Sequence, residues 1–161
     1  MFKELDKISE VAGYLWEKGW AEYNGGNISV NVTASLGEEL RNAEPLSGRI
    51  ALPAQLKLLA GELFYVTGTG KRMRDVARDL WGNGAVIRIC DDGRGYEIVY
   101  KENIPPTSEL ASHLFIHHYL REMGRDMKVV LHTHPTELIA ITHIDKWLDA
   151  KALTRMLWSM I

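Results

Sequence analysis

His132 and His134 are the residues of this sequence that point most clearly to a chemical role. They lie two positions apart at the end of a predicted strand. The segment 128–132 is rich in β-branched and apolar residues, which is typical of a strand. Side chains at positions i and i+2 of a strand point to the same face, so both imidazoles can bind one cation. Pro135 follows and ends the strand. The pattern predicts a divalent-metal site, and a pair of ordinary polar residues at a strand edge is the alternative.

Glu109 is the candidate acid–base group. It follows Pro105-Pro106-Thr107-Ser108, a run that is typical of the start of a helix. A carboxylate at this position can simply stabilise the N-terminus of the helix through its negative charge, and that role needs no ligand. Close to a cation and shielded from water, however, a carboxylate has a tuned pKa and can act as a base. The sequence leaves both roles open for Glu109.

Two glycine-rich turns are candidates for binding an anion. They are Asn24-Gly25-Gly26-Asn27 and Thr67-Gly68-Thr69-Gly70. Most turns of this composition serve only the chain reversal, but such turns can also offer backbone N–H groups to a phosphate. The side chains of Asn24, Asn27 and Thr69 would add donors. The basic run 71–74 follows the second turn, where it either strengthens an anion site or forms a solvated basic face.

The elements that must position these groups alternate between helices and strands. Hydrophobic periodicity and turn residues predict a helix over 5–16, a strand over 28–32, a surface loop over 33–50, a short helix at 56–59, a strand over 63–66, a hairpin of strands 85–90 and 95–100, a helix from 107 with a buried stripe that includes Phe115 and His118, a strand over 128–132, a helix from about 136 and a last helix over 152–160. The fold class expected is α/β, with a mixed, partly antiparallel central sheet flanked by helices.

Composition narrows the class of protein. The chain has 161 residues, of which 46% are hydrophobic and 25% charged, as expected of one soluble globular domain over 1–161. A formal net charge of -2 provides no electrostatic basis for binding nucleic acid or an anionic membrane, and no apolar run is long enough to span a bilayer. The single cysteine, Cys90, excludes an intrachain disulfide and fits a reducing cytoplasm.

The order of four motifs gives the chain a resemblance to a known family. These motifs are Asn-Gly-Gly-Asn-Ile-Ser (24–29), Thr-Gly-Thr-Gly-Lys (67–71), Pro-Thr-Ser-Glu-Leu (106–110) and His-Thr-His-Pro (132–135). Together they resemble the class II aldolase/adducin family over nearly the whole chain. The resemblance implies a zinc-dependent sugar-phosphate aldolase, in which the cation polarises the substrate oxygens and stabilises the enediolate left by bond cleavage.

The resemblance also implies a role for each motif. His132 and His134 match two of the three zinc histidines of the family, and Glu109 matches its catalytic acid/base. Residues implied to hold the substrate phosphate or its neighbouring oxygens are Asn24, Gly26, Asn27, Thr67, Gly68, Thr69, Gly70 and Ser108. One Zn2+ per subunit, a small ketose phosphate as the only ligand class, and a cytoplasmic homotetramer are the further expectations.

The chain departs from the family pattern at its C-terminal end. The third zinc histidine has no counterpart here, so the domain is expected to be incomplete at its C-terminus and its zinc site open. His113 and His117, four residues apart on a predicted helix, are possible substitutes, although such histidines are more often surface or core residues. The alternatives within the fold are a fuculose-phosphate aldolase, a pentulose-phosphate epimerase and a thiosugar-phosphate dehydratase, and outside catalysis an adducin-like binding or scaffold fragment.

Overall fold

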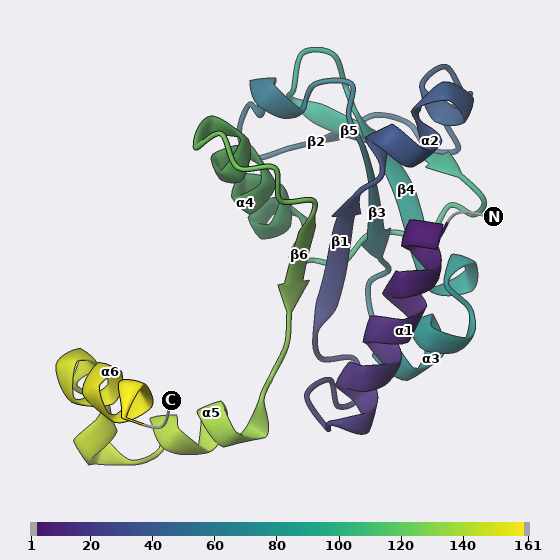
Figure 1. Cartoon of the computed structure of the whole chain (residues 1–161). Helices are drawn as coiled ribbons and strands as arrows, with labels where there is room; N and C mark the ends of the chain where they lie inside the picture. Colours follow the sequence, from purple (N-terminus) through teal and green to yellow (C-terminus); the bar gives the residue numbers. More distant parts are fainter. Residues whose placement is uncertain (1–2, 160–161) are drawn as a thin grey trace.

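The protein forms one antiparallel sheet between two layers of helices (Figure 1). The computed structural model describes residues 3–159. The strands are β1 (Asn27–Asn31), β2 (Ile50–Ala51), β3 (Leu63–Thr67), β4 (Gly84–Ile89), β5 (Gly95–Tyr100) and β6 (Val129–His132). Their order is β2-β5-β4-β3-β1-β6, and each neighbouring pair is antiparallel, including those outside the predicted β4–β5 hairpin. The helices are α1 (Lys3–Glu17), α2 (Thr33–Leu40), α3 (Met73–Arg78), α4 (Leu110–Glu122), α5 (Thr136–Thr142) and α6 (Ala150–Trp158).

Alternate side chains of the central strands enter two separate hydrophobic cores. Leu63 and Tyr65 of β3 are buried together with residues of α1, α2 and α3. Phe64 and Val66 are buried on the opposite face with residues of α4 and the short 3-10 helix η1 (Lys57–Leu59). Because a strand directs successive side chains to opposite faces, one sheet supports both cores. The predicted α/β class, with a sheet flanked by helices, is therefore confirmed.

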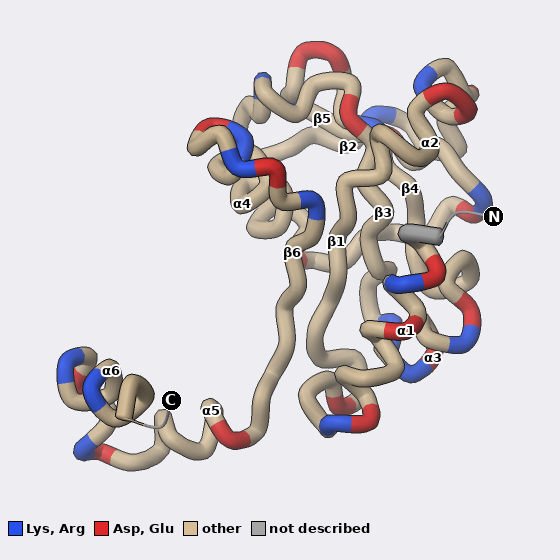
Figure 2. The backbone as a smooth tube through the Cα atoms, in the orientation of Figure 1, with Lys and Arg blue, Asp and Glu red and all other residues tan. Residues whose placement is uncertain are grey.

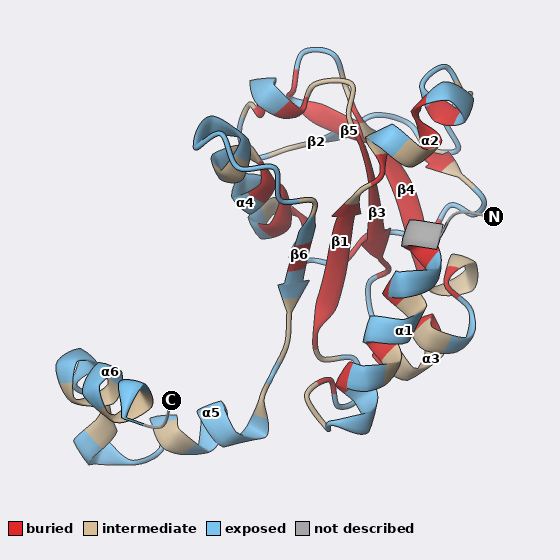
Figure 3. Ribbon diagram, in the orientation of Figure 1, coloured by how far each residue is buried: buried red, intermediate tan, exposed pale blue. Residues whose placement is uncertain are grey.

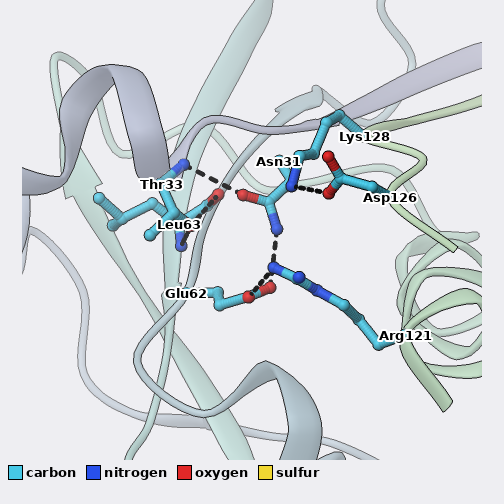
Figure 4. A network of polar contacts seen from close by, with 7 residues as sticks. All are labelled: Asn31, Thr33, Glu62, Leu63, Arg121, Asp126 and Lys128. Carbon is cyan, nitrogen blue, oxygen red and sulfur yellow. Dashed lines mark hydrogen bonds and ion pairs between the residues drawn. The ribbon is translucent and has the colours of Figure 1, made fainter. Parts of the chain in front are cut away.

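A polar network ties α4 to the end of β1 (Figure 4). Asn31 Nδ2 donates to Glu62 Oε2 over 2.7 Å, and the guanidinium of Arg121 in α4 contacts the same carboxylate. The hydroxyl oxygen of Thr33 accepts the backbone N–H of Leu63 over 2.9 Å. These contacts hold the C-terminal end of α4 beside the end of β1 and the start of β3. The N-terminal end of α4 is thereby directed to the other end of the sheet.

The segment 33–50 begins with a helix, where the sequence predicts only a surface loop. Leu36 and Leu40 of α2 lie one helical turn apart and are 1% and 3% exposed, respectively. They complete the core beneath β1 and β3. The prediction was wrong because two leucines in a mostly polar segment of eight residues give too weak a periodicity to distinguish a short helix from a loop.

The buried face of α4 also differs from the predicted stripe. Leu110 and Leu114 are buried as part of the predicted stripe, but His113 and His117 occupy the remaining inner positions, each 2% exposed. Phe115 instead is 41% exposed. The helix is rotated in this way because polar residues of β1, which periodicity within α4 cannot reveal, face it from the sheet.

The segment after β6 extends away from the sheet (Figure 1). The predicted helices α5 and α6 are present, and Met160, which was predicted to belong to the last helix, lies outside the described residues. Neither helix has a buried residue among those described, in contrast to the buried central strands (Figure 3). Within residues 3–159, no helix combines the length and the apolar character that crossing a bilayer requires.

Candidate metal and phosphate site

Three turns that are far apart in the sequence meet at one end of the sheet. β1 starts at Asn27, β3 ends at Thr67, and the two strands are antiparallel neighbours. β6 pairs with the other side of β1 so that His132 lies opposite Asn27. The result is a cavity of about 280 Å³ lined by the segments 24–27, 68–71 and 107–109 together with His134. Strand pairing therefore brings all four sequence motifs to one place.

The two histidines of β6 and its exit have the spacing of metal ligands. His132 Nε2 and His134 Nε2 are 3.1 Å apart. Two imidazole nitrogens bound to one tetrahedral zinc ion lie about 3.4 Å apart, so a small side-chain adjustment would suffice. The other ring nitrogen of His132, Nδ1, is buried and makes no hydrogen bond within the described part of the chain, although Glu109 Oε2 lies 2.6 Å away. A carboxylate at this nitrogen is the usual partner that orients a metal-bound histidine.

The donor set fits a divalent metal but supplies only part of a site. Among residues 3–159, no group of three His, Cys, Asp or Glu side chains is arranged to hold an ion. His113 and His117, which the sequence left open as substitutes, lie behind the cavity, where both ring nitrogens of His113 and Nε2 of His117 contact Ser29 or Asn27. The ring nitrogens of His132 and His134 lie at a mutual distance that suits two ligands of one metal ion.

The double glycine of the first turn allows it to lie against the histidine segment. Gly26 has φ +78, and a Cβ atom there would lie 2.9 Å from the carbonyl oxygen of His132. At Gly25, a Cβ atom would lie 3.0 Å from His134 Nδ1. A larger residue at either position would push the turn off the histidines. These glycines thus shape the cavity through the absence of a side chain.

Glu109 lies at the start of α4, with its carboxylate beside His132. It occupies the N-cap position of the helix, but its side chain makes no capping hydrogen bond. Thr107 Oγ1 accepts the N–H of Glu109 over 3.3 Å, which fixes the turn that leads into the helix. The capping explanation therefore does not account for Glu109, whose carboxylate lines the cavity next to His132. Ser108 is exposed and lines the same cavity.

The second turn offers fewer backbone donors than its sequence suggests. The N–H groups of Gly68, Thr69 and Lys71 donate to carbonyl oxygens of Asn83, Pro105 and Gly68, over 2.9, 2.9 and 3.3 Å. An anion must therefore be held mainly by side chains. Within residues 3–159, no ion pair occupies the ammonium group of Lys71, which lines the cavity.

Thr67 has a different position from the other predicted residues. It is 2% exposed, and its Oγ1 accepts the N–H of Ile28 over 3.1 Å. The side chain therefore connects β3 to β1 beneath the cavity. The remaining residues predicted to bind substrate line the cavity itself; they are Asn24, Gly26, Asn27, Gly68, Thr69, Gly70 and Ser108.

Sequence reasoning missed a buried polar cluster directly behind Asn27. Ser29 Oγ lies 2.8 Å from His113 Nδ1 and 2.9 Å from His117 Nε2. His113 Nε2 in turn contacts Asn27 Oδ1. Burial lowers the pKa of both histidines, that of His117 to about 4, so both rings are neutral at pH 7. The available signal was the alternation of polar and apolar residues over 27–30 together with two histidines four residues apart.

The overall charge contributes little to the site. Basic and acidic residues are interspersed along the helices and loops (Figure 2), and the formal net charge is -2. Attraction of an anion to the cavity therefore depends on nearby groups, above all Lys71.

The chain is similar in sequence to proteins of a known family. The profile of the class II aldolase and adducin N-terminal domain matches residues 6–160. A rhamnulose-1-phosphate aldolase from Bacteroides thetaiotaomicron is 52% identical over 159 residues, which cover 99% of this chain and 59% of that protein. One from Listeria welshimeri is 36% identical over 98% of this chain and 57% of that protein. The chain thus spans less than two thirds of the length of these relatives.

A solved structure of a sugar-phosphate aldolase has a similar fold. The crystal structure of a sugar-phosphate aldolase from Thermotoga maritima superimposes with a TM-score of 0.73 at 29% identity, covering 94% of this chain and 66% of that one. With the family profile matching almost from end to end, the chain belongs to the class II aldolase and adducin family.

Proposed function

We propose that this chain forms the metal- and phosphate-binding part of a zinc-dependent aldolase that cleaves L-rhamnulose 1-phosphate into dihydroxyacetone phosphate and L-lactaldehyde. The observation that carries the proposal is the cavity in which three separate turns, Glu109 and His134 meet, with His132 in contact with both of these side chains. The name of the relative that is 52% identical, rhamnulose-1-phosphate aldolase, supports this choice of substrate.

His132 and His134 would hold the zinc ion through their ring nitrogens, with one ion per subunit. When bound, zinc supplies Lewis-acid polarisation of the substrate oxygens. Catalytic zinc sites usually have three protein ligands, so a third ligand is needed. We propose that it comes from outside the 161 residues, because Glu109 is needed for proton transfer and no third histidine lies beside the pair in the described part of the chain.

The residues of this chain would divide the remaining work between binding and proton transfer. Lys71 and the polar side chains of Asn24, Asn27, Thr69 and Ser108 surround the space for the phosphate, and Gly26, Gly68 and Gly70 let the backbone approach it. In cleavage, the C3–C4 bond would break, the C4 hydroxyl would give its proton to the Glu109 carboxylate as the aldehyde forms, and the electron pair would remain on C3. Glu109 would deliver the proton that C3 then accepts.

The test is turnover of a panel of sugar phosphates, with dihydroxyacetone phosphate measured through coupled oxidation of NADH. We expect cleavage of L-rhamnulose 1-phosphate in the presence of zinc, loss of cleavage with a chelator, and a decrease of about 100-fold or more in Glu109→Gln. Preference for L-fuculose 1-phosphate or a pentulose phosphate would refute the substrate assignment. A folded protein that neither binds zinc nor turns over any substrate would favour a binding or scaffold domain.

The proposal includes a cytoplasmic homotetramer. The outer face of α4 presents Ile116, Tyr119 and Met123, which are 46%, 58% and 55% exposed, and such an apolar stripe is suited to contact with another subunit. Light scattering after size-exclusion chromatography gives the mass directly. A monomer at the concentration of the activity assay, in an active preparation, would contradict this part of the proposal.

A further inference from the structure

Behind the cavity, four polar side chains form a continuous hydrogen-bonded chain in a buried layer. It runs from His117 through Ser29 and His113 to Asn27, and all four residues are at most 6% exposed. On one side the ring of Phe64 packs against His117, with ring centroids 4.8 Å apart. On the other side Asn27 reaches the cavity, whose wall it forms. We call these residues the buried relay.

The chemistry of the groups sets the direction of each hydrogen bond. The amide oxygen of Asn27 can only accept, so His113 must carry its proton on Nε2. His113 Nδ1 is then an acceptor, and it takes the hydroxyl proton of Ser29. The oxygen of Ser29 accepts from His117, which must also be protonated on Nε2. All three bonds thus point from His117 toward Asn27.

This direction has a consequence for the cavity. An asparagine side chain is nearly symmetric in shape, and rotation by about 180° exchanges its acceptor oxygen and its donor NH2 group. With Oδ1 held by His113, the NH2 group is the part of the amide that remains for the cavity, which Asn27 lines. Without that bond the oxygen could turn toward the cavity and repel an anion there.

We propose that Ser29, His113 and His117 are positioning residues that hold the amide of Asn27 with its NH2 group directed at the phosphate of the substrate. This inference rests on the proposed function, because it names the group that the amide would bind. It also explains why two neutral histidines and a serine are buried between a strand and a helix. Burial of polar groups is costly unless they are hydrogen-bonded, and with Asn27 Oδ1 facing His113 the three bonds all run in one direction.

The first test is a nitrogen NMR experiment on the whole chain at pH 7, without any ligand. Long-range correlations between ring protons and nitrogens report which nitrogen of a neutral histidine carries the proton. We expect Nε2–H for both His113 and His117. A proton on Nδ1 of His113 would overturn the inference, because the amide of Asn27 would then have to be reversed. This measurement does not depend on aldolase activity or on zinc.

The second test uses inorganic phosphate as the probe and measures its dissociation constant by 31P NMR titration. Ser29→Ala and His113→Leu each interrupt the relay, and we expect affinity for phosphate to fall about 5- to 10-fold. His113→Gln is the matched control, because its amide can still donate to Asn27 Oδ1, and its affinity should stay within about twofold of the unmodified protein.

The outcomes separate the inference from the proposed function. Equal phosphate affinity in His113→Leu and His113→Gln would overturn the positioning role, even if the enzyme is an aldolase. If the unmodified protein does not bind phosphate while both rings carry Nε2–H, the relay stands and the phosphate-binding function proposed for the cavity is refuted. Should either variant be unfolded, as judged by circular dichroism, the ring-proton measurement on the unmodified chain still decides.

Discussion

Two cavities lie at opposite ends of β3, and they differ in a way that size does not predict. The larger, of about 1140 Å³, lies where β3 begins and is lined by many charged residues. Its charges are largely used within the protein: Arg49 pairs with Asp92 over 2.6 Å, and Arg88 pairs with Glu97 over 2.8 Å. The smaller, of about 280 Å³, lies where β3 ends.

The smaller cavity has fewer charges, and they converge on one space. Lys71 has no ion pair among residues 3–159, and the Glu109 carboxylate lies 2.6 Å from His132 Nδ1, beside the histidine pair. A site is therefore better recognised by functional groups that converge on one space than by volume or number of charges. We accordingly expect the larger and the smaller cavity to respond differently to substitution and to pH.

The largest effect is expected on stability at low pH. His117 has an ordinary pKa of 6.5 and a folded-state pKa of about 4, lowered by burial and then by the neighbouring His113. Because the folded pKa is the lower one, this contribution is complete above pH 6.5 and decreases as pH falls toward 4. The loss amounts to about 3 kcal/mol once the ring is fully protonated, and most of it has occurred by pH 4.5. Urea unfolding at pH 7 and pH 4.5 measures it, and His117→Gln should remove most of the difference.

The ion pairs of the larger cavity should affect stability in a different pH range. The N–H of Arg94 and the guanidinium of Arg49 hold the pKa of Asp92 below 3.8. Its contribution is thus present above pH 3.8 and decreases only as pH falls through the lower folded-state value. Asp92→Asn should accordingly leave the change between pH 7 and 4.5 intact. If Asp92→Asn abolished that change, the relay would not be its source.

Zinc affinity should depend on the histidine pair and not on the carboxylates of the larger cavity. His134→Ala removes one of two ligand nitrogens, and we expect an affinity loss of about 100-fold by calorimetry. Asp92→Ala removes a carboxylate from the larger cavity and should change zinc affinity by less than about twofold. Equal losses in the two variants would contradict the assignment of His132 and His134 as ligands.

The next effect concerns the shape of the first turn. Gly26→Ala places a Cβ atom 2.9 Å from the carbonyl oxygen of His132 in a residue with φ +78. We expect a loss of about 2 kcal/mol in the free energy of unfolding. Gly124→Ala is the control, because φ is +66 there and no atom lies within 4 Å of the added Cβ. Its cost should be nearer 1 kcal/mol, and zinc binding should be unaffected.

The smallest effect is expected for phosphate binding by single cations. Lys71→Ala should weaken inorganic phosphate about fivefold, since it removes the unpaired ammonium group of the cavity. Arg49→Ala removes a cation that is already paired with Asp92 and should have no measurable effect. A larger loss of phosphate affinity in Arg49→Ala than in Lys71→Ala would place the anion site in the larger cavity and contradict the role of Lys71.

The sequence predicted the parts of this molecule whose signals are local. We correctly predicted the helix over 5–16, the hairpin of β4 and β5, and the family. Each of these predictions depends on residues that are close together in the sequence: periodicity, turn residues and short motifs. The roles of His132, His134 and Glu109 were inferred in the same way and stay predictions. Their position around one cavity gives those predictions a geometric basis.

What the sequence could not supply are contacts set by strand pairing. Whether His113 is a surface, core or ligand residue depends on which residues of β1 face α4, and that follows from register with distant strands. The use of backbone N–H groups in the turn after β3 depends likewise on Pro105, more than thirty residues away. The buried relay therefore had no local signature strong enough to separate it from ordinary helix histidines.

β1 carries the core on one face and the relay on the other, and this has a consequence for how the protein can change by mutation. Ile28 and Val30 enter the apolar core, while Asn27 and Ser29 face α4. Insertion or deletion of one residue before or within this strand would exchange the two faces, placing polar groups in the core and apolar ones behind the cavity. Length variation among homologues should therefore be absent between 24 and 31 and be accommodated in loops such as 41–49.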